Sequence, residues 1–433
     1  MFGQSAVAID DKLNIEPSVF TANNGMTVCV LKNTRVPLVS HVLFYKVGSF
    51  NEPVGLSGMA HLLEHMMFKA TKERDSNYYV EQLEKIGARY NAATSAEYTV
   101  YYATFPKEYL ALVMQLESHR MNSLLINNDE LAKEKNVVME ERRQRVENNE
   151  FAKMMESMNV FLWLNYPYAH PTVGWEHDIY AISRDDLLNF YNKYYSPSNT
   201  ILVLAGDVSV EDAKEMVDKY YPAKNSTNLA TPNIKQLLPK LYGNTYTTIA
   251  DSKIKQNKII RSYRAPGIGS DLHNALIFRV LGEVISGKRN SQLYKYLVVE
   301  RKVAVELDTE VDVIGNIGVF TFALMPSANV SMDVLSKELD SFLADLAKKG
   351  VSNEQVEIAK NSLKISNIYM HGSIDIMARY YAQIIALGLP NSFFANGYAD
   401  YMEKISLDDV NNAIKSLVSG YFVEGWLKGD SAS

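Results

Sequence analysis

Cysteine is nearly absent from this chain of 433 residues, which contains only Cys29. A single cysteine excludes an intrachain disulfide, and it excludes the cysteine-rich metal sites that need several thiolates. Cys29 stands in residues 26–31, Met-Thr-Val-Cys-Val-Leu, a pattern typical of a strand. We therefore expect Cys29 to be a buried packing residue rather than a nucleophile.

Long apolar runs and an excess of basic charge are also missing. No stretch approaches about 18 consecutive apolar residues, so the sequence predicts no membrane span. The net charge of −6 and the lack of a basic arm or zinc-knuckle spacing argue against nucleic-acid binding. The composition, 47% hydrophobic and 22% charged, is ordinary for a soluble globular protein, and the length suffices for more than one domain.

The compartment is left open by the first residues of the sequence. Ala6-Val7-Ala8 is similar to the small-residue end of a signal peptide, although a chance triplet explains it equally well. On this pattern we expect a soluble protein, with the bacterial periplasm preferred over the cytoplasm.

Residues 61–65, His-Leu-Leu-Glu-His, combine the residue types of a metal site. If this segment is helical, His61 and His65 lie four residues apart on one face. That spacing lets one nitrogen of each ring reach the same cation, while Glu64 lies beside them and can face a metal-bound water. The order is H-x-x-E-H, the reverse of the H-E-x-x-H of other zinc peptidases. A polar helix face without metal is the alternative interpretation.

A second predicted helix carries carboxylates at a suitable spacing. Residues 129–142 place apolar side chains on one side of a helix, after a capping segment at 127–129. Glu134 and Glu141 are seven residues apart, nearly two turns, so both carboxylates can point the same way. One could bind a metal while the other orients a ligand histidine. A solvated acidic and basic surface is equally compatible with this spacing.

The chain resembles the pitrilysin-type (M16) zinc metallopeptidases, a family that includes insulin-degrading enzyme. It is most similar to the short two-domain members related to mitochondrial processing peptidase and to the bacterial M16B peptidases. Residues 47–53, Val-Gly-Ser-Phe-Asn-Glu-Pro, with Gly55, Gly58 and the H-x-x-E-H motif, resemble the opening of that family. The family's E-x-x-V-V-x-x-E segment, which follows the motif, corresponds to residues 134–141 here.

The resemblance assigns roles to these residues one by one. It implies Zn2+ as the cofactor, with three protein ligands: His61, His65 and Glu141. Glu64 is then the general base that activates a zinc-bound water, and Glu134 contacts a ligand histidine without binding the metal. Glu140 is the alternative candidate for the third ligand. The helical phase relative to Glu134 favours Glu141 over Glu140.

The resemblance also predicts where a substrate binds. Residues 87–95 and 97–102 are similar to the family's edge strand, which pairs with the substrate backbone, and their β-branched and aromatic residues suit a strand. An open edge offers unpaired N–H and C=O groups that an extended peptide can complete. Substrate binding is thereby assigned to four residues: Asn91, Ala92, Ala93 and Thr94. By their residue types alone, the same positions fit an ordinary strand.

The order of predicted elements indicates an α+β fold of two similar α/β-sandwich halves, a tandem degenerate repeat. Strand-like runs occupy 26–31, 38–47 and 98–105, then 246–250, 257–263, 303–311 and 316–324, while 331–349 and 353–370 read as helices. We expect mixed or antiparallel sheets with helices on one side, forming half of a clamshell chamber. The second half carries no H-x-x-E-H, as the resemblance implies for a degenerate copy.

The domain boundaries follow from a change in composition. Residues 223–244 are polar and rich in asparagine and proline near their start, as in a linker. We expect an N-terminal metal-binding catalytic domain at 1–222 and a C-terminal metal-less domain at 245–433.

One departure from the family concerns its substrate-holding donors. In many members the second half supplies an arginine and a tyrosine near the scissile bond. Aligned on residues 291–304, these positions fall at Val299 and Glu306, and neither side chain can donate to an oxyanion. Arg301 is close in sequence but lies on another helix face. Because such a donor contributes about 3 kcal/mol, we expect a dimer, either a homodimer or a heterodimer with a metal-less M16-like subunit that supplies the pair.

The function that this pattern indicates is a zinc-dependent endopeptidase. It would hydrolyse unfolded or short peptides inside an enclosed chamber, as the metal-bearing subunit of a dimer. The alternative is a non-catalytic or partner-dependent subunit that acts as a peptide-binding or assembly scaffold. A zinc assay separates the two, because the scaffold members of the family usually degrade the metal motif.

Overall fold

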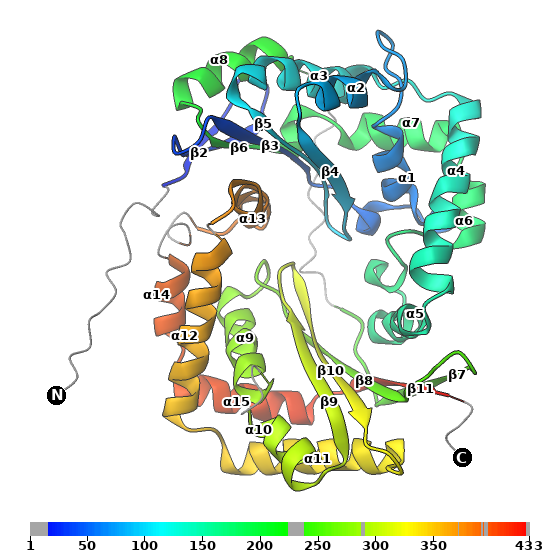
Figure 1. Ribbon diagram of the computed structural model, residues 1–433, viewed down its shortest axis with the longest axis vertical. Helices are drawn as coiled ribbons and strands as arrows, with labels where there is room; N and C mark the ends of the chain where they lie inside the picture. Colours follow the sequence, from blue (N-terminus) through cyan, green and yellow to red (C-terminus); the bar gives the residue numbers. More distant parts are fainter. Residues whose placement is uncertain are drawn as a thin grey trace, which may run out of the picture.

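The computed structural model of the chain describes residues 16–223, 238–286, 291–370, 372–390, 393 and 397–429. The predicted linker at 223–244 lies mostly outside these residues. Two sheets, one on each side of it in the sequence, organise the described part of the molecule (Figure 1). No helix of the described residues is long and apolar enough to cross a membrane.

The first half contains a six-stranded sheet in the order β1-β2-β6-β3-β5-β4. Its strands are β1 Ser18–Thr21, β2 Thr27–Lys32, β3 Leu38–Tyr45, β4 Arg89–Thr94, β5 Thr99–Pro106 and β6 Thr200–Gly206. Its α-helices are α1 Met59–Met66, α2 Tyr78–Lys85, α3 Leu110–Ser123, α4 Asn128–Arg142, α5 Glu150–Trp163, α6 Glu176–Ala181, α7 Arg184–Tyr194 and α8 Val210–Tyr220. Cys29 is buried in β2, as predicted, and burial raises the pKa of its thiol to about 12.

The second half contains a five-stranded sheet in the order β7-β11-β8-β10-β9. Its strands are β7 Thr245–Ala250, β8 Lys258–Pro266, β9 Ala304–Asp312, β10 Ile317–Pro326 and β11 Phe422–Lys428. Its α-helices are α9 Leu272–Ser286, α10 Gln292–Tyr294, α11 Met332–Lys349, α12 Asn353–Met370, α13 Ile374–Ala386, α14 Gly397–Glu403 and α15 Leu407–Ser419.

The two sheets repeat one topology, which confirms the predicted α+β fold of two similar halves. In the first, β2 and β6 are parallel, and β6-β3-β5-β4 continue antiparallel. In the second, β7 and β11 are parallel, and β11-β8-β10-β9 continue antiparallel. The edge strands β4 and β9 therefore occupy equivalent places, and β4 of the first half is the predicted edge strand.

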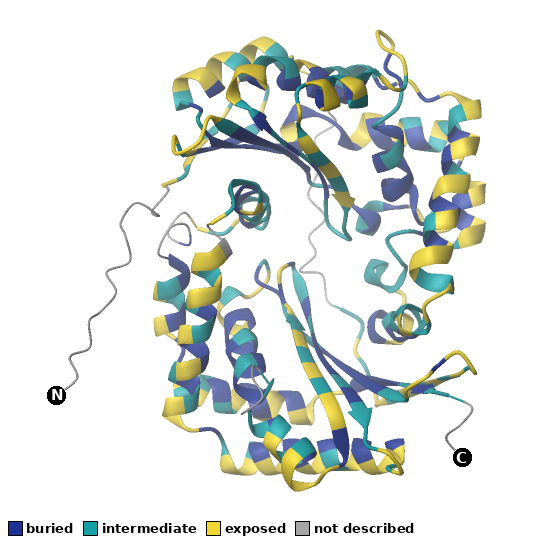
Figure 2. Cartoon of the chain, viewed as in Figure 1, coloured by how far each residue is buried: buried dark blue, intermediate teal, exposed yellow. Residues whose placement is uncertain are grey.

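Each sheet is also covered by a helix from the other half. The prediction had placed helices on one side of each sheet and did not include this covering helix. Helix α13 of the second half packs on β3, β5 and β6, while α5 of the first half packs on β11, β7 and β8 (Figure 1). Every residue of β6, Thr-Ile-Leu-Val-Leu-Ala-Gly, is consequently buried (Figure 2). A strand buried on both faces requires such a continuous apolar run.

The packing of α5 on the second sheet depends on a glycine. A Cβ added at Gly425 in β11 would lie 2.4 Å from Sδ of Met154 and 2.6 Å from Sδ of Met158. Both methionines are buried in α5, so the helix approaches the strand backbone closely. These contacts hold the middle of α5 against the second sheet.

Candidate metal centre and active site

The helix that carries the H-x-x-E-H motif begins at a tightly packed glycine. Gly58 precedes α1 with a φ of +88°, and an added Cβ would lie 2.6 Å from the carbonyl oxygen of Val173. The Glu52 carboxylate accepts the backbone N–H groups of Gly58 at 2.9 Å and Ala60 at 2.7 Å. Burial raises the pKa of the Glu52 carboxyl to about 8, and it outweighs these two amides, which favour the charged carboxylate. The start of α1 is thus fixed by side chains outside the helix.

The predicted metal ligands are brought together by α1 and α4. The rings of His61 and His65 lie with centroids 4.7 Å apart. Glu141 of α4 places one carboxylate oxygen 3.7 Å from Nε2 of His61 and the other 3.3 Å from Nε2 of His65. One donor atom of each residue lies within 4.8 Å of the other two. Among the described residues, no other group of this kind gathers histidine, cysteine or carboxylate side chains.

Two imidazoles and one carboxylate form a donor set that fits zinc. Burial and the charge of His65 lower the pKa of His61 to about 4, so its ring is neutral and able to donate a lone pair at neutral pH. Burial also disfavours the cation of His65, but the carboxylates of Glu134 and Glu141 raise its pKa to about 9. His65 would have to release a proton on binding a cation, which makes the fit dependent on pH.

Glu64 lies beside these ligands but outside the cluster. Its carboxylate accepts a short hydrogen bond from the Thr94 hydroxyl on β4. The Glu64 side chain is buried, and burial raises the pKa of its carboxyl above the ordinary value. A carboxylate with a raised pKa, held by one fixed donor, is suited to take up and return a proton.

Residues 27–173 match the family model "Insulinase (Peptidase family M16)", and residues 181–363 match "Peptidase M16 inactive domain". The chain belongs to peptidase family M16. The boundary between the two matches falls inside the first half, before α7, and the second match extends into α12 of the second half.

Several M16 relatives resemble most of the chain. The "Zinc protease PqqE" of Helicobacter pylori is 28% identical over 85% of this chain and 84% of its own. The "Uncharacterized zinc protease YmxG" of Bacillus subtilis is 24% identical over 80% and 82%. A crystal structure of a protease from H. pylori has the same fold, with a TM-score of 0.87 and 23% identity over 96% of this chain and all of that chain.

A second carboxylate of α4 contacts the motif of this M16 protein, as the resemblance predicted. Glu134 lies 2.9 Å from Nδ1 of His65, and its other oxygen lies 2.7 Å from Nζ of Lys69. Burial opposes ionisation of Glu134, but His65 and Lys69 hold the pKa of its carboxyl below the ordinary value. Glu140, the rival ligand, is exposed and pairs with Arg143 at 3.1 Å, so it lies away from the cluster.

Three contacts of the site were missed by the sequence analysis. Thr94 was predicted only to bind substrate, and the contact of its hydroxyl with Glu64 was not foreseen. Lys69 lies four residues after His65, a spacing that could have indicated its place near Glu134. Arg145 follows Glu141 by one helical turn, and its guanidinium lies 2.7 Å from the Glu141 carboxylate. The Thr94 contact had no signal in the sequence, because it joins two segments 30 residues apart.

The predicted substrate strand β4 lies at the edge of its sheet and pairs only with β5 among the described strands. The N–H of Ser95 donates to the carbonyl of Tyr98 at 2.8 Å in the connecting turn. Hydrogen-bonded and open pairs alternate in antiparallel strands, so the N–H and C=O groups of Ala92 and Thr94 face the free edge. The N–H of Ala92 is covered by Oδ1 of Asn91 at 2.9 Å.

The second half places no arginine or tyrosine at the two predicted positions. Val299 is 56% exposed in a π-helical turn at Lys295–Glu300, and Glu306 is exposed on β9. Arg301 forms an ion pair with Glu338 of α11, which also accepts a hydrogen bond from Tyr296 at 2.9 Å. Arg301 is therefore engaged within its own half.

Proposed function

We propose that this M16 protein is a zinc-dependent endopeptidase that hydrolyses unfolded or short peptides in an enclosed chamber. The observation that carries the proposal is the convergence of His61, His65 and Glu141, with Glu64 beside them but outside the cluster. The names of the relatives, which include several zinc proteases, support the same class of reaction.

The cation and the protein divide the chemistry between them. When bound by His61, His65 and Glu141, zinc supplies a Lewis acid that polarises the scissile carbonyl and acidifies water. Glu64 takes a proton from the attacking water and returns it to the leaving amine. The Thr94 hydroxyl, at the end of β4, donates a hydrogen bond to the Glu64 carboxylate. The same strand would therefore position both the general base and the bound peptide.

The substrate backbone is proposed to bind along β4, at Asn91, Ala92, Ala93 and Thr94. An extended peptide would pair with the free-edge groups of Ala92 and Thr94 without regard to its side chains. The Asn91 side chain must move off the Ala92 amide for this pairing to form. Recognition by backbone groups fits unfolded or short peptides, because a folded protein rarely offers a free extended strand.

The direct test is cleavage of an unstructured peptide by the purified chain, with its zinc content measured in parallel. We expect about one zinc ion per chain, loss of cleavage on chelation, and recovery when zinc is restored. A chain that neither holds zinc nor cleaves any peptide would support the alternative function, a non-catalytic peptide-binding or assembly scaffold.

A partner chain is proposed because the second half lacks the donor pair at Val299 and Glu306. Either a homodimer or a heterodimer with a metal-less M16-like subunit that supplies an arginine and a tyrosine would close the chamber. Purification from the native source, with identification of any chain that accompanies this one, separates the two.

A periplasmic location is proposed from the Ala6-Val7-Ala8 pattern and from the fold shared with the periplasmic protease PqqL of Escherichia coli.

Replacing Glu134 with glutamine should weaken zinc binding by about ten- to a hundredfold. The amide can still accept the Nδ1–H of His65, but it lacks the charge that supports the imidazole as a ligand. Competition with a chelating dye measures the affinity. Glu140→Gln, on the exposed side of the same helix, is the matched control, and equal affinities in the two variants would remove Glu134 from the site.

A further inference from the structure

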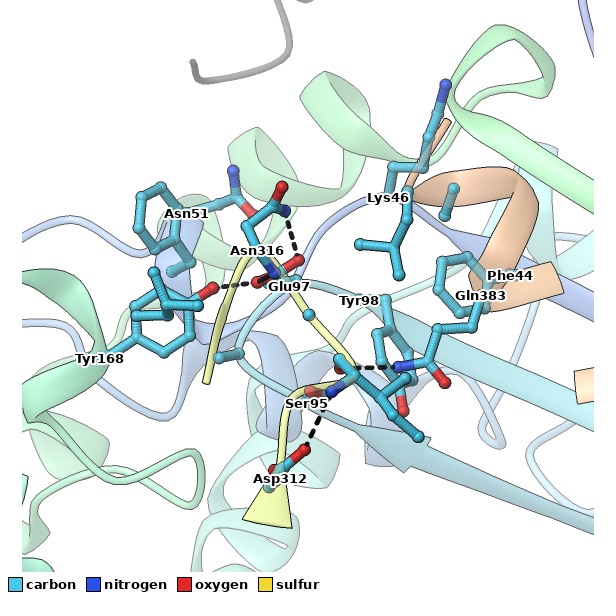
Figure 3. A pocket seen from close by; sticks show the side chains of 17 residues that line it. Phe44, Lys46, Asn51, Ser95, Glu97, Tyr98, Tyr168, Asp312, Asn316 and Gln383 are labelled. Carbon is cyan, nitrogen blue, oxygen red and sulfur yellow. Dashed lines mark hydrogen bonds between the residues drawn. The ribbon is translucent and has the colours of Figure 1, made fainter. Parts of the chain in front are cut away.

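A single carboxylate joins the two halves at the turn between β4 and β5. Glu97 accepts the backbone N–H of Asn316 at 2.9 Å and the side-chain amide of Asn316 at 2.7 Å. It also accepts a short hydrogen bond from the hydroxyl of Tyr168, in the first half (Figure 3). Glu97 therefore belongs to the hairpin of β4 and β5, which we call the substrate hairpin because β4 is the proposed substrate strand. Asn316, its main donor, belongs to the turn between β9 and β10.

The turn that carries Asn316 is fixed to the body of the second half. The N–H of Ile268 donates to the carbonyl of Val313 at 2.8 Å, and the N–H of Gly269 donates to that of Gly315 at 2.9 Å. A Cβ at Gly267 would lie 2.4 Å from the carbonyl carbon of Asn316, so the two backbones are in close contact. Glu97 thus contacts a rigid point rather than a free loop.

On the first-half side, the same hairpin turn is linked to the metal helix. The N–H of Ser49 donates to the carbonyl of Ser95 at 3.1 Å, and the N–H of Phe50 donates to that of Ala96 at 2.8 Å. The segment then reaches Glu52, which accepts two amides at the start of α1. A second link between the hairpin and α1 is the hydrogen bond from the Thr94 hydroxyl on β4 to the carboxylate of Glu64 on α1.

Beside Glu97, Phe44 and Tyr98 of the first half pack into an apolar cluster that also contains residues of the second half. A cavity of about 230 Å³ lies beside Glu97, lined by residues of both halves that include Phe44, Tyr98, Ile314 and Gln383 (Figure 3). The hydrogen bonds of Glu97 to Asn316 add a polar connection between the halves beside this cavity. Hydrogen bonds to a charged acceptor are the stronger kind.

We propose that Glu97 is a positioning residue, whose hydrogen bonds to Asn316 align the substrate strand β4 with the second half. The expected effect on peptide binding rests on the proposed function, whereas the expected effect on the mobility of the hairpin does not. Glu97 itself touches neither the metal ligands nor the edge groups of β4. Its loss should let the hairpin move while the ligand cluster, held by α1 and α4, keeps its geometry.

The test compares Glu97→Ala and Glu97→Gln in the full chain. We expect Glu97→Ala to raise the KM for an unstructured peptide about tenfold at unchanged zinc content, because the strand is no longer held in place. Glu97→Gln should recover most of the affinity, since its amide can still accept from the Asn316 backbone. Binding of a labelled peptide, measured by anisotropy in the Glu64→Gln background, provides the same comparison without turnover.

Arg264→Gln is the matched control, because Arg264 also joins the halves but away from the hairpin. Its Nε donates to the carbonyl of Leu162 in α5 at 2.7 Å. A rise in KM as large as that of Glu97→Ala would overturn the proposal, as would wild-type binding by Glu97→Ala. Amide hydrogen exchange across residues 89–100 should accelerate in Glu97→Ala, and unchanged exchange would also overturn it. Exchange needs no substrate, so it separates this inference from the failure of the wild-type chain to bind peptides.

Discussion

Glu64→Gln should retain zinc and lose peptide cleavage by about a hundred- to ten-thousandfold, the range for removal of a general acid–base group. The amide is nearly the same size as the carboxylate, so the Thr94 hydroxyl keeps an acceptor. It cannot accept a proton from water at neutral pH, and the attack therefore loses its base. The measurement is kcat with an unstructured peptide, together with zinc per chain.

Glu81→Gln is the matched control for this variant. Glu81 is an exposed carboxylate of α2, and none of the site contacts described above involves it. We expect wild-type cleavage from this control and equal zinc content in both variants. Cleavage by Glu64→Gln within a few-fold of the wild-type rate would remove Glu64 from the reaction and leave the hydrolase proposal without its base.

The second large effect is expected from His65→Ala, which should lose zinc itself. The affinity should fall by more than the roughly hundredfold upper limit expected at Glu134, because a ligand atom is removed rather than a supporting contact. His65 also contacts Glu134 and Glu141, so its loss leaves two neighbouring carboxylates without their shared partner. Zinc per chain after purification measures the effect directly, and His61→Ala should behave in the same way.

His177→Ala is the control, because this histidine is exposed on α6 with 82% of its side-chain surface accessible. It should retain zinc at the wild-type level. The urea unfolding midpoint of each zinc-free protein shows whether a loss of metal follows from unfolding. One zinc ion per chain in a folded His65→Ala variant would place the metal elsewhere.

The local parts of the candidate site could be predicted because helices impose their own spacing. The four-residue interval between His61 and His65 and the seven-residue interval between Glu134 and Glu141 each set one face of a helix. The strand periodicity likewise located β2, β3 and β5 and four strands of the second half, β7 to β10, to within a few residues, whereas β11 was not predicted. In each case the signal depends only on residues that are close in the sequence.

Contacts between distant segments had no comparable signal. The Thr94 hydroxyl reaches Glu64 because β4 passes beside α1, and no periodicity indicates how a strand lies against a helix. An amphipathic pattern in α5 or α13 shows that one face is buried, but it does not say against which sheet. The reciprocal placement of these two helices was therefore absent from the prediction, and so was the contact of Glu97 with Asn316.

Three features of this protein were determined by the sequence alone. They are the residue types of the candidate zinc site, the helical spacing of its ligands, and the repeated order of strands and helices. Each follows from backbone geometry over a few turns. Only the tertiary structure decided that α1 and α4 meet, that Thr94 contacts Glu64, and that Glu97 of the β4–β5 hairpin contacts the second half. The physical reason is that these arrangements depend on how apolar faces pack together. Packing is a property of the whole chain, not of any one segment.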